Sequence, residues 1–339
     1  MKYVYILAIL ILIMPVTQAQ EEITLSSLTL KEKIAQSVMV KGNKFDDKFT
    51  ELGVGGVFLD GLESEEAYKE LIEKYQDSSK IKLFVATDLE GYWNPFPNYK
   101  SKSFGEIKNQ EQAYQLGKEH GQILKETGFN LDFSLIAESK NTVWPGRSFI
   151  GSNEEIKQKI KFYIKGLQEQ RVMAIAKHYP GGSMLKDPHI FKVKANISEQ
   201  DLELFDIAIK NNVSAIMIGH TIVSGTIDSK TKQSTVSKEV ISHLREKQKF
   251  KGIVITDAIG MMGLRWSYLF NHEKLYVDLA KAGNDIILDS AFSFSNHGER
   301  AEKGINAVVK AVENGEISEK RIDESVKRIL EAKGYQVIS

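Results

Sequence analysis

The chain contains no cysteine, so its 339 residues offer no disulfide, no thiolate metal site, no cysteine nucleophile and no lipid-modified cysteine. An excess of charge is also lacking: 45 basic residues balance 45 acidic ones, which leaves no overall attraction for nucleic acid or an anionic membrane. Only six prolines occur, and no Pro/Ser-rich linker divides the chain. The composition, 42% hydrophobic and 27% charged, is typical of a soluble globular domain with ample material for a core.

The first nineteen residues differ in composition from the rest. Lys2 precedes an apolar run over residues 3–16, and Thr17 and Ala19 supply small residues at the usual cleavage positions. We expect a secretory signal peptide over residues 1–19 and a periplasmic or secreted mature protein without a stable membrane anchor. An uncleaved anchor is the alternative, although the run is shorter than a membrane-spanning helix usually is. Residues 20–339 are expected to form one folded domain.

From residue 23 onward, short apolar segments alternate with segments of helical period. Seven segments are typical of buried strands: residues 53–59, 82–87, 130–136, 172–176, 215–218, 252–255 and 285–288. Helices are expected to start at Thr29, to cover residues 65–75, 111–126, 154–170, 198–211, 237–247 and 273–282, and to close the chain as a pair. This alternation predicts a parallel sheet with right-handed crossovers.

The number of strands favours an α/β fold of the closed (β/α)8, TIM-barrel type with one degenerate unit. A doubly wound open sheet is the alternative. That fold usually carries a glycine-rich phosphate turn after its first strand, whereas Gly53, Gly55 and Gly56 precede and enter the first expected strand. The chain also lacks a Walker-type loop, so the barrel is favoured.

Ionisable residues follow nearly every expected strand. Barrel enzymes build their active sites from residues just past the carboxyl ends of the strands. These positions hold Asp88, Glu138, Lys177, His178, His220, Asp257 and Asp289. The set predicts an active site, although single members have structural alternatives: a core hydrogen bond for His220, a helix cap for Asp289 and a supporting carboxylate for Glu138.

The residues do not fit a metal site or a serine nucleophile. The histidines lie on separate segments with no i, i+4 pair, and no Gly-x-Ser-x-Gly elbow occurs. We therefore expect no metal and no cofactor. Two features remain for chemistry: Asp257, a carboxylate after a strongly apolar strand, and the pair Asp187 and His189, which could shuttle a proton.

Several spaced motifs resemble glycoside hydrolase family 3, specifically its single-domain β-N-acetylglucosaminidase (β-N-acetylhexosaminidase) branch. The main matches are residues 177–181 (KHYPG), 187–189 (DPH) and 254–258 (VITDA). Supporting matches are residues 88–91 (DLEG), 146–149 (GRSF), 217–220 (MIGH) and 282–285 (AGND). The resemblance extends from about residue 28 to residue 333.

This resemblance implies a retaining hydrolase for β-linked N-acetylhexosamine, with N-acetylglucosamine from cell-wall or chitin-type saccharides as the expected sugar. Asp257 would attack the anomeric carbon and form a glycosyl-aspartate intermediate. His189 would protonate the leaving oxygen and then deprotonate water, while Asp187 orients its imidazole. The residues assigned to substrate binding are Asp88, Arg147, Lys177, His178, His220 and Trp93.

The expected partner is an oligosaccharide or a muropeptide-type substrate, in the setting of peptidoglycan recycling, and the protein is expected to act as a monomer. Because a neutral imidazole would admit an anion that a second carboxylate would repel, phosphorolysis is an alternative reaction. The chain also departs from the family pattern at Gly182 and Ser183, where His-Gly is usual, and at Trp93, where arginine is usual. Pro188 stiffens the loop that holds His189. These departures motivate a further alternative, a catalytically silent sugar-binding barrel.

Overall fold

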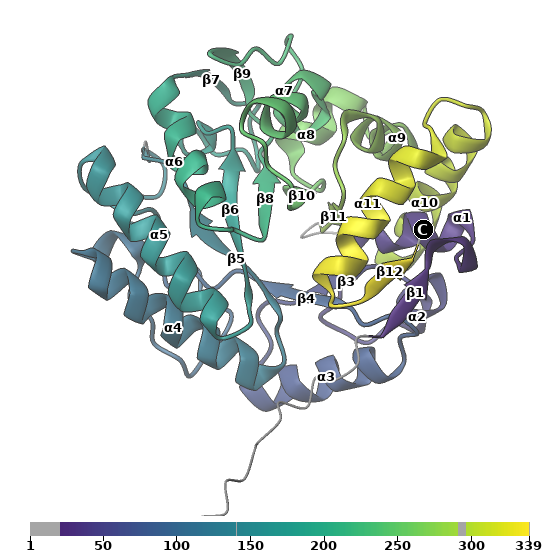
Figure 1. The fold of residues 1–339 in the computed structure, drawn as a ribbon, viewed down its shortest axis with the longest axis horizontal. Helices are drawn as coiled ribbons and strands as arrows, with labels where there is room; N and C mark the ends of the chain where they lie inside the picture. The colour runs from purple at the N-terminus through teal and green to yellow at the C-terminus, as the bar shows by residue number, and fades with distance from the viewer. Residues whose placement is uncertain (1–20, 140, 291–295, 339) are drawn as a thin grey trace, which may run out of the picture.

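A computed structural model describes residues 21–139, 141–290 and 296–338 (Figure 1). Eight parallel strands form a ring, and helices surround it on the outside (Figure 1). The α/β barrel expected from the sequence is therefore confirmed, whereas the expected signal peptide, residues 1–19, lies outside the described residues. Within the described ranges, no helix is both long enough and apolar enough to cross a membrane.

The barrel strands are hydrogen-bonded in the order β10-β8-β6-β5-β4-β3-β2-β11. A parallel bridge between Ile255 and Ile286 joins β10 to the residue before β11 and completes the ring. The strands are β2 (Val38–Lys41), β3 (Gly56–Phe58), β4 (Phe84–Thr87), β5 (Leu131–Ile136), β6 (Met173–Tyr179), β8 (Ala215–Ile218), β10 (Ile253–Thr256) and β11 (Ile287–Asp289).

The helices begin at polar caps of the kind that the sequence predicts. Thr29 and Glu32 form a reciprocal capping box at the start of α1, and Ser64 caps α3. The helices are α1 (Leu30–Gln36), α2 (Asp47–Leu52), α3 (Glu65–Asp77), α4 (Gln110–Thr127), α5 (Asn153–Glu169), α6 (Glu199–Lys210), α7 (Lys238–Ser242), α8 (Met262–Arg265), α9 (His272–Ala282), α10 (His297–Glu313) and α11 (Glu319–Ala332). A π-helical turn, His243–Lys247, continues α7.

The strand that sequence analysis missed is β2. It follows α1 after a single residue, Ser37, so no glycine or proline separates its apolar residues from the helix. The seven expected strands were therefore one short. The unit is also degenerate in its helix, since α2 has only six residues.

Two apolar cores hold the fold together. One fills the ring and includes Phe58, Phe84, Phe133 and Met217, and the other lies between the strands and the surrounding helices. Ile329 of α11 belongs to the inner core, so α11 closes the end of the barrel where the strands begin. Residues at the opposite end, past the strands, are left to form a mouth.

Two short strand pairs lie outside the ring. At the closed end, β1 (Glu22–Thr24) pairs in parallel with β12 (Gln336–Ile338), and the Tyr335 hydroxyl accepts the amide of Lys82, just before β4. In the loops at the mouth, β7 (Lys194–Ile197) pairs with β9 (Ile222–Gly225). Sequence analysis did not anticipate either pair.

Candidate active site

An ionic cluster lies at the ends of β4 and β6, buried except for the partly exposed Asp88. The ammonium of Lys177 donates to Asp88 Oδ1 at 2.5 Å and lies 2.7 Å from Glu90 Oε1. Arg147 donates to both oxygens of Glu90, from Nε at 2.6 Å and from Nη2 at 2.8 Å. Three of the residues assigned to the sugar, from three separate segments, are thus brought together around one carboxylate.

Glu90 is the residue of this cluster that sequence analysis left unassigned. Its side chain is fully buried. Burial alone would raise the pKa of Glu90, but the charges of Arg147 and Lys177 outweigh burial and hold the pKa below its ordinary value. The pKa of Lys177 is correspondingly raised, because Asp88 and Glu90 outweigh the opposing effect of burial. Glu90 and Lys177 therefore stay charged, and Glu90 fixes the positions of both cations.

His178 lies between two carboxylates. Its Nδ1 lies 3.0 Å from Glu138 Oε1, and its Nε2 lies 4.0 Å from Asp257 Oδ2. Glu138 also accepts the backbone amides of His178 and Ser183. The expectation that Glu138 supports other residues fits this geometry, and Ser183, at an altered family position, is one of those it holds.

Asp257 directly follows β10 and is buried at the mouth. The amide of Ala258 donates to its Oδ1 at 2.8 Å. Burial would raise the pKa of Asp257, but the imidazoles of His178 and His220 and the amide of Ala258 together lower it. Asp257 is therefore an ionised carboxylate at neutral pH, as a nucleophile must be.

His220 and Trp93 lie differently from the other assigned residues. Both ring nitrogens of His220 already have protein partners, the Thr235 hydroxyl at 2.8 Å and the Ala258 carbonyl at 3.0 Å, and burial lowers its pKa. This geometry favours the structural alternative, in which His220 holds the backbone beside Asp257. Trp93 is 46% exposed, and its carbonyl accepts the amide of Glu90, which places it on the outer edge of the mouth.

The pair Asp187 and His189 lies on a tight loop between β6 and β7. Asp187 Oδ1 lies 2.8 Å from Nδ1 of His189 and also accepts the His189 amide at 2.9 Å. Met262, on the segment that follows Asp257, donates its amide to the His189 carbonyl at 2.9 Å. The loop with the proposed proton shuttle is thereby held against the loop that follows the proposed nucleophile.

Trp144 links the ionic cluster to this loop, a role that sequence analysis missed. Its ring lies 5.9 Å from the His189 ring in an edge-on arrangement, and the Arg147 guanidinium lies 5.2 Å from its centroid. A single tryptophan beside the GRSF segment gave no periodic or motif signal that could have revealed this contact.

The prediction that Asp289 caps a helix is wrong. The Asp289 side chain is fully buried and bonds to the Tyr276 hydroxyl, to His272 Nε2 at 3.2 Å and to the Arg300 guanidinium. These partners lie on α9 and α10, the helices on either side of β11. Burial would raise the pKa of Asp289, but His272 and Arg300 lower it to about 2. Asp289 therefore joins two helices to the barrel.

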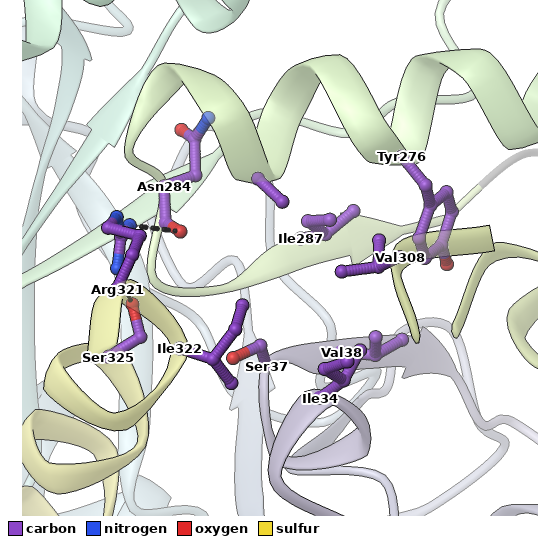
Figure 2. A pocket seen from close by; sticks show the side chains of 11 residues that line it. Ile34, Ser37, Val38, Tyr276, Asn284, Ile287, Val308, Arg321, Ile322 and Ser325 are labelled. Carbon is purple, nitrogen blue, oxygen red and sulfur yellow. Dashed lines mark hydrogen bonds between the residues drawn. The ribbon is translucent and has the colours of Figure 1, made fainter. Parts of the chain in front are cut away.

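Neither a metal centre nor the cavity of Figure 2 accounts for the mouth residues. Among the described side chains, no three His, Cys, Asp or Glu residues gather in a way that could hold a metal ion. Figure 2 shows a cavity away from the mouth, lined by Ile34, Tyr276, Val308 and Ile322 from four different helices. Its volume of about 20 Å³ leaves room for one water molecule and is too small for a sugar.

Comparison with known protein families shows which family the chain belongs to. The model of the glycosyl hydrolase family 3 N terminal domain matches residues 29–332. The chain belongs to this family. The resemblance inferred from the motifs is thus confirmed, and membership in family 3 makes the protein a glycosidase by class.

The relatives of this protein include a beta-hexosaminidase of Haemophilus ducreyi. The two sequences are 29% identical over 64% of this chain and 68% of that protein. An uncharacterized secreted glycosyl hydrolase of Arthroderma benhamiae is 26% identical over 73% of each chain. A solved family 3 beta-N-acetylglucosaminidase from Paenibacillus sp. str. FPU-7 superposes with a TM-score of 0.82 at 27% identity. That match covers 90% of this chain but 62% of the solved chain.

Proposed function

We propose that the protein is an exported retaining β-N-acetylhexosaminidase that releases N-acetylglucosamine from cell-wall or chitin-type saccharides. The observation that carries the proposal is the pairing, at one barrel mouth, of the buried ionised Asp257 with the Asp187–His189 pair. The names of the relatives from Haemophilus ducreyi and Paenibacillus support the sugar, and the secreted relative supports export.

In the first step, a carboxylate oxygen of Asp257 attacks the anomeric carbon as the bond to the leaving oxygen breaks. Because Nδ1 of His189 faces Asp187, Nε2 is the nitrogen that would give its proton to the leaving oxygen. Asp187 keeps its contact with Nδ1 throughout and so holds the imidazole ring in this orientation. The product is a glycosyl ester of Asp257.

In the second step, water attacks the anomeric carbon from the side that the leaving group vacated. Nε2 of His189 accepts the water proton, and Asp257 departs as a carboxylate, which restores the enzyme. Two inversions give net retention. Throughout both steps, Asp88, Lys177 and Arg147 would hold the sugar hydroxyls by charged hydrogen bonds.

The test measures hydrolysis of aryl N-acetyl-β-glucosaminides by Asp257→Ala and His189→Ala. Each change is expected to lower kcat/KM on the order of 10³-fold, as losses of nucleophiles and general acids do. His189→Ala should lose less with a dinitrophenyl leaving group, which departs without a proton, whereas Asp257→Ala should not recover. The matched control is Asp228→Ala, since Asp228 is exposed and its partner among the described residues is the exposed Lys230.

Full activity in either variant would refute the assigned mechanism. The phosphorylase alternative is supported by the histidine that takes the place of a second carboxylate. The same assay with added phosphate tests it, because a phosphorylase would yield sugar 1-phosphate. Tight sugar binding without turnover across a panel of aryl glycosides would instead show a silent binding barrel.

A further inference from the structure

Large apolar side chains are exposed on two neighbouring segments at one edge of the mouth. These are Ile190 and Phe191, beyond His189, and Trp266, Leu269 and Phe270, beyond α8; we call them the apolar rim. Their exposed fractions range from 45% for Phe191 to 83% for Leu269. Single exposed apolar residues are ordinary, but a group of five on adjoining segments marks an interaction surface.

The two segments are in direct contact. A Cβ on Gly263 would lie 2.4 Å from the carbonyl oxygen of Phe191, so α8 and the loop meet backbone to backbone. Trp266 follows Gly263 by three residues and therefore lies on the same side of the helix, one turn further along. The rings of Trp266 and Phe270 lie 5.3 Å apart. The rim is therefore continuous rather than two separate patches.

The backbone of the rim is unusual as well. Leu269 and Phe270 have φ angles of 47° and 63°, in the left-handed region that glycine and asparagine occupy more easily. If the turn served only to connect two helices, glycine or asparagine at these positions would adopt the left-handed backbone with less strain. Instead, two strained residues hold apolar side chains out to solvent.

Exposed positive charge borders the rim on the first of its two segments, although the chain as a whole is neutral. Lys186, Lys192 and Lys194 are exposed on the first segment, and the Lys186 ammonium lies 3.8 Å above the Phe191 ring. Between residues 183 and 198 the single acidic residue is Asp187, which is bonded to His189. Residues 258–272 contain no acidic residue at all.

We propose that the apolar rim docks the protein on the surface of an anionic lipid bilayer. Aliphatic and aromatic side chains bordered by lysines are the combination that inserts at a lipid interface, the apolar groups into the acyl boundary and the ammonium groups against acidic headgroups. The exposed aliphatic residues Ile190 and Leu269 suit lipid better than sugar, which prefers flat aromatic faces. Docking is reversible, is independent of the reaction proposed above, and turns the mouth toward glycans held at the bilayer.

The test is sedimentation with vesicles of phosphatidylcholine alone or with phosphatidylglycerol, at low and high salt. The protein should bind the anionic vesicles, more weakly in high salt. The variant Leu269→Asn with Phe270→Asn should lower the partition coefficient at least tenfold, since each side chain loses the transfer of its apolar surface. Asparagine accepts the left-handed backbone, so the turn is kept. The control is Ile338→Asn, a comparably exposed apolar residue on β12 at the closed end.

Lys192→Gln with Lys194→Gln should weaken binding to anionic vesicles and leave the residual binding to neutral ones unchanged. Absence of binding to anionic vesicles by the unchanged protein overturns the proposal. A concentration-dependent dimer that the asparagine variant abolishes, without vesicle binding, would show a second copy on the rim. Retention on insoluble glycan alone would show a sugar surface. Turnover of a small aryl glycoside is measured in parallel, so that a failure of vesicle binding can be told apart from a failure of the proposed hydrolase activity.

Discussion

Behind the mouth, Asp132 of β5 supports the turn that carries Asp88 and Glu90. Its Oδ1 accepts the amide of Leu89 at 3.0 Å, and Oδ2 lies 3.4 Å from the Tyr163 hydroxyl. Tyr163 in turn contacts Ser134 and the buried His120. Burial raises the pKa of Asp132 to about 8 despite the donated hydrogen bonds. The acid is therefore largely protonated at neutral pH, and it holds the turn without adding charge to the cluster.

Asp132→Asn should make stability less sensitive to pH. Since the folded pKa lies above the unfolded value, the stability that the neutral acid contributes is complete below pH 4 and is lost as pH rises to about 8. The loss amounts to about 1.4 kcal/mol per pH unit for one group. In urea unfolding at pH 5 and pH 8, the free energy of unfolding of the variant should rise relative to that of the unchanged protein as the pH increases. Parallel profiles, like those expected for Asp228→Asn, would contradict the argument.

For single residues, the sequence predicted that Asp88, Lys177, His178, Asp257 and the Asp187–His189 pair would lie at the mouth. The structure brings them to one end of the barrel. Glu90 could not be singled out, because a glutamate in a loop is ordinary until its complete burial between two cations is known. Trp144 and the pairing of both His220 nitrogens depend likewise on contacts between distant loops, which no local pattern reports.

Among the elements, α8 decides where the loop with His189 lies. Gly263 lets the helix approach so closely that an added Cβ would also lie 2.6 Å from the Pro188 carbonyl oxygen. Both clashing atoms belong to the backbone and cannot be relieved by a side-chain rotation. The position of His189 relative to Asp257 thus depends on one missing methyl group.

Gly263→Ala should therefore lower kcat more than tenfold, because a displacement of about 1 Å at a proton donor is costly. The measurement is steady-state kinetics on an aryl glycoside, with thermal unfolding as a check that the fold persists. In a His189→Ala background the same change should have little further effect, since the two act through one group. A full additional loss in that background would show that Gly263 acts elsewhere.

The elements themselves were largely predictable. Seven of the eight barrel strands were found from apolar runs between turn residues, because buried parallel strands read as continuous apolar segments. The eighth, β2, was hidden by its direct junction with α1. The pairing of β7 with β9 was also hidden, because both strands are short and lie in polar loops whose partner is set by tertiary contact rather than by alternation.

Over the whole molecule, Asp285 ties the last helix to the closed end of the barrel. Its buried carboxylate bonds to Arg245 at 2.5 Å, to Arg328 at 3.0 Å and to the Ser325 hydroxyl, and it also accepts the amide of Val254. Arg245 extends from the π-helical turn after α7, and Arg328 from α11. One carboxylate therefore holds two helices to two strands.

Asp285→Asn should destabilise the protein by about 3 kcal/mol, because removing one partner of a buried ion pair leaves its cations uncompensated. Chemical denaturation measures the loss. The rate of the folded enzyme on an aryl glycoside should change little, since the cluster lies at the end opposite the mouth. Asp228→Asn serves as the exposed control, and a loss of activity equal to that of the site variants would contradict this division between the two ends.

The strand pair β1–β12 places residues 22–24 beside residues 336–338 at the closed end of the barrel. A linker joined to the described chain just before Glu22 or just after Ile338 would therefore start on the side away from Asp257. An enzyme fused to a display protein or fixed to a bead through such a linker would present its mouth to the bulk solution, where even a bulky glycan could reach it.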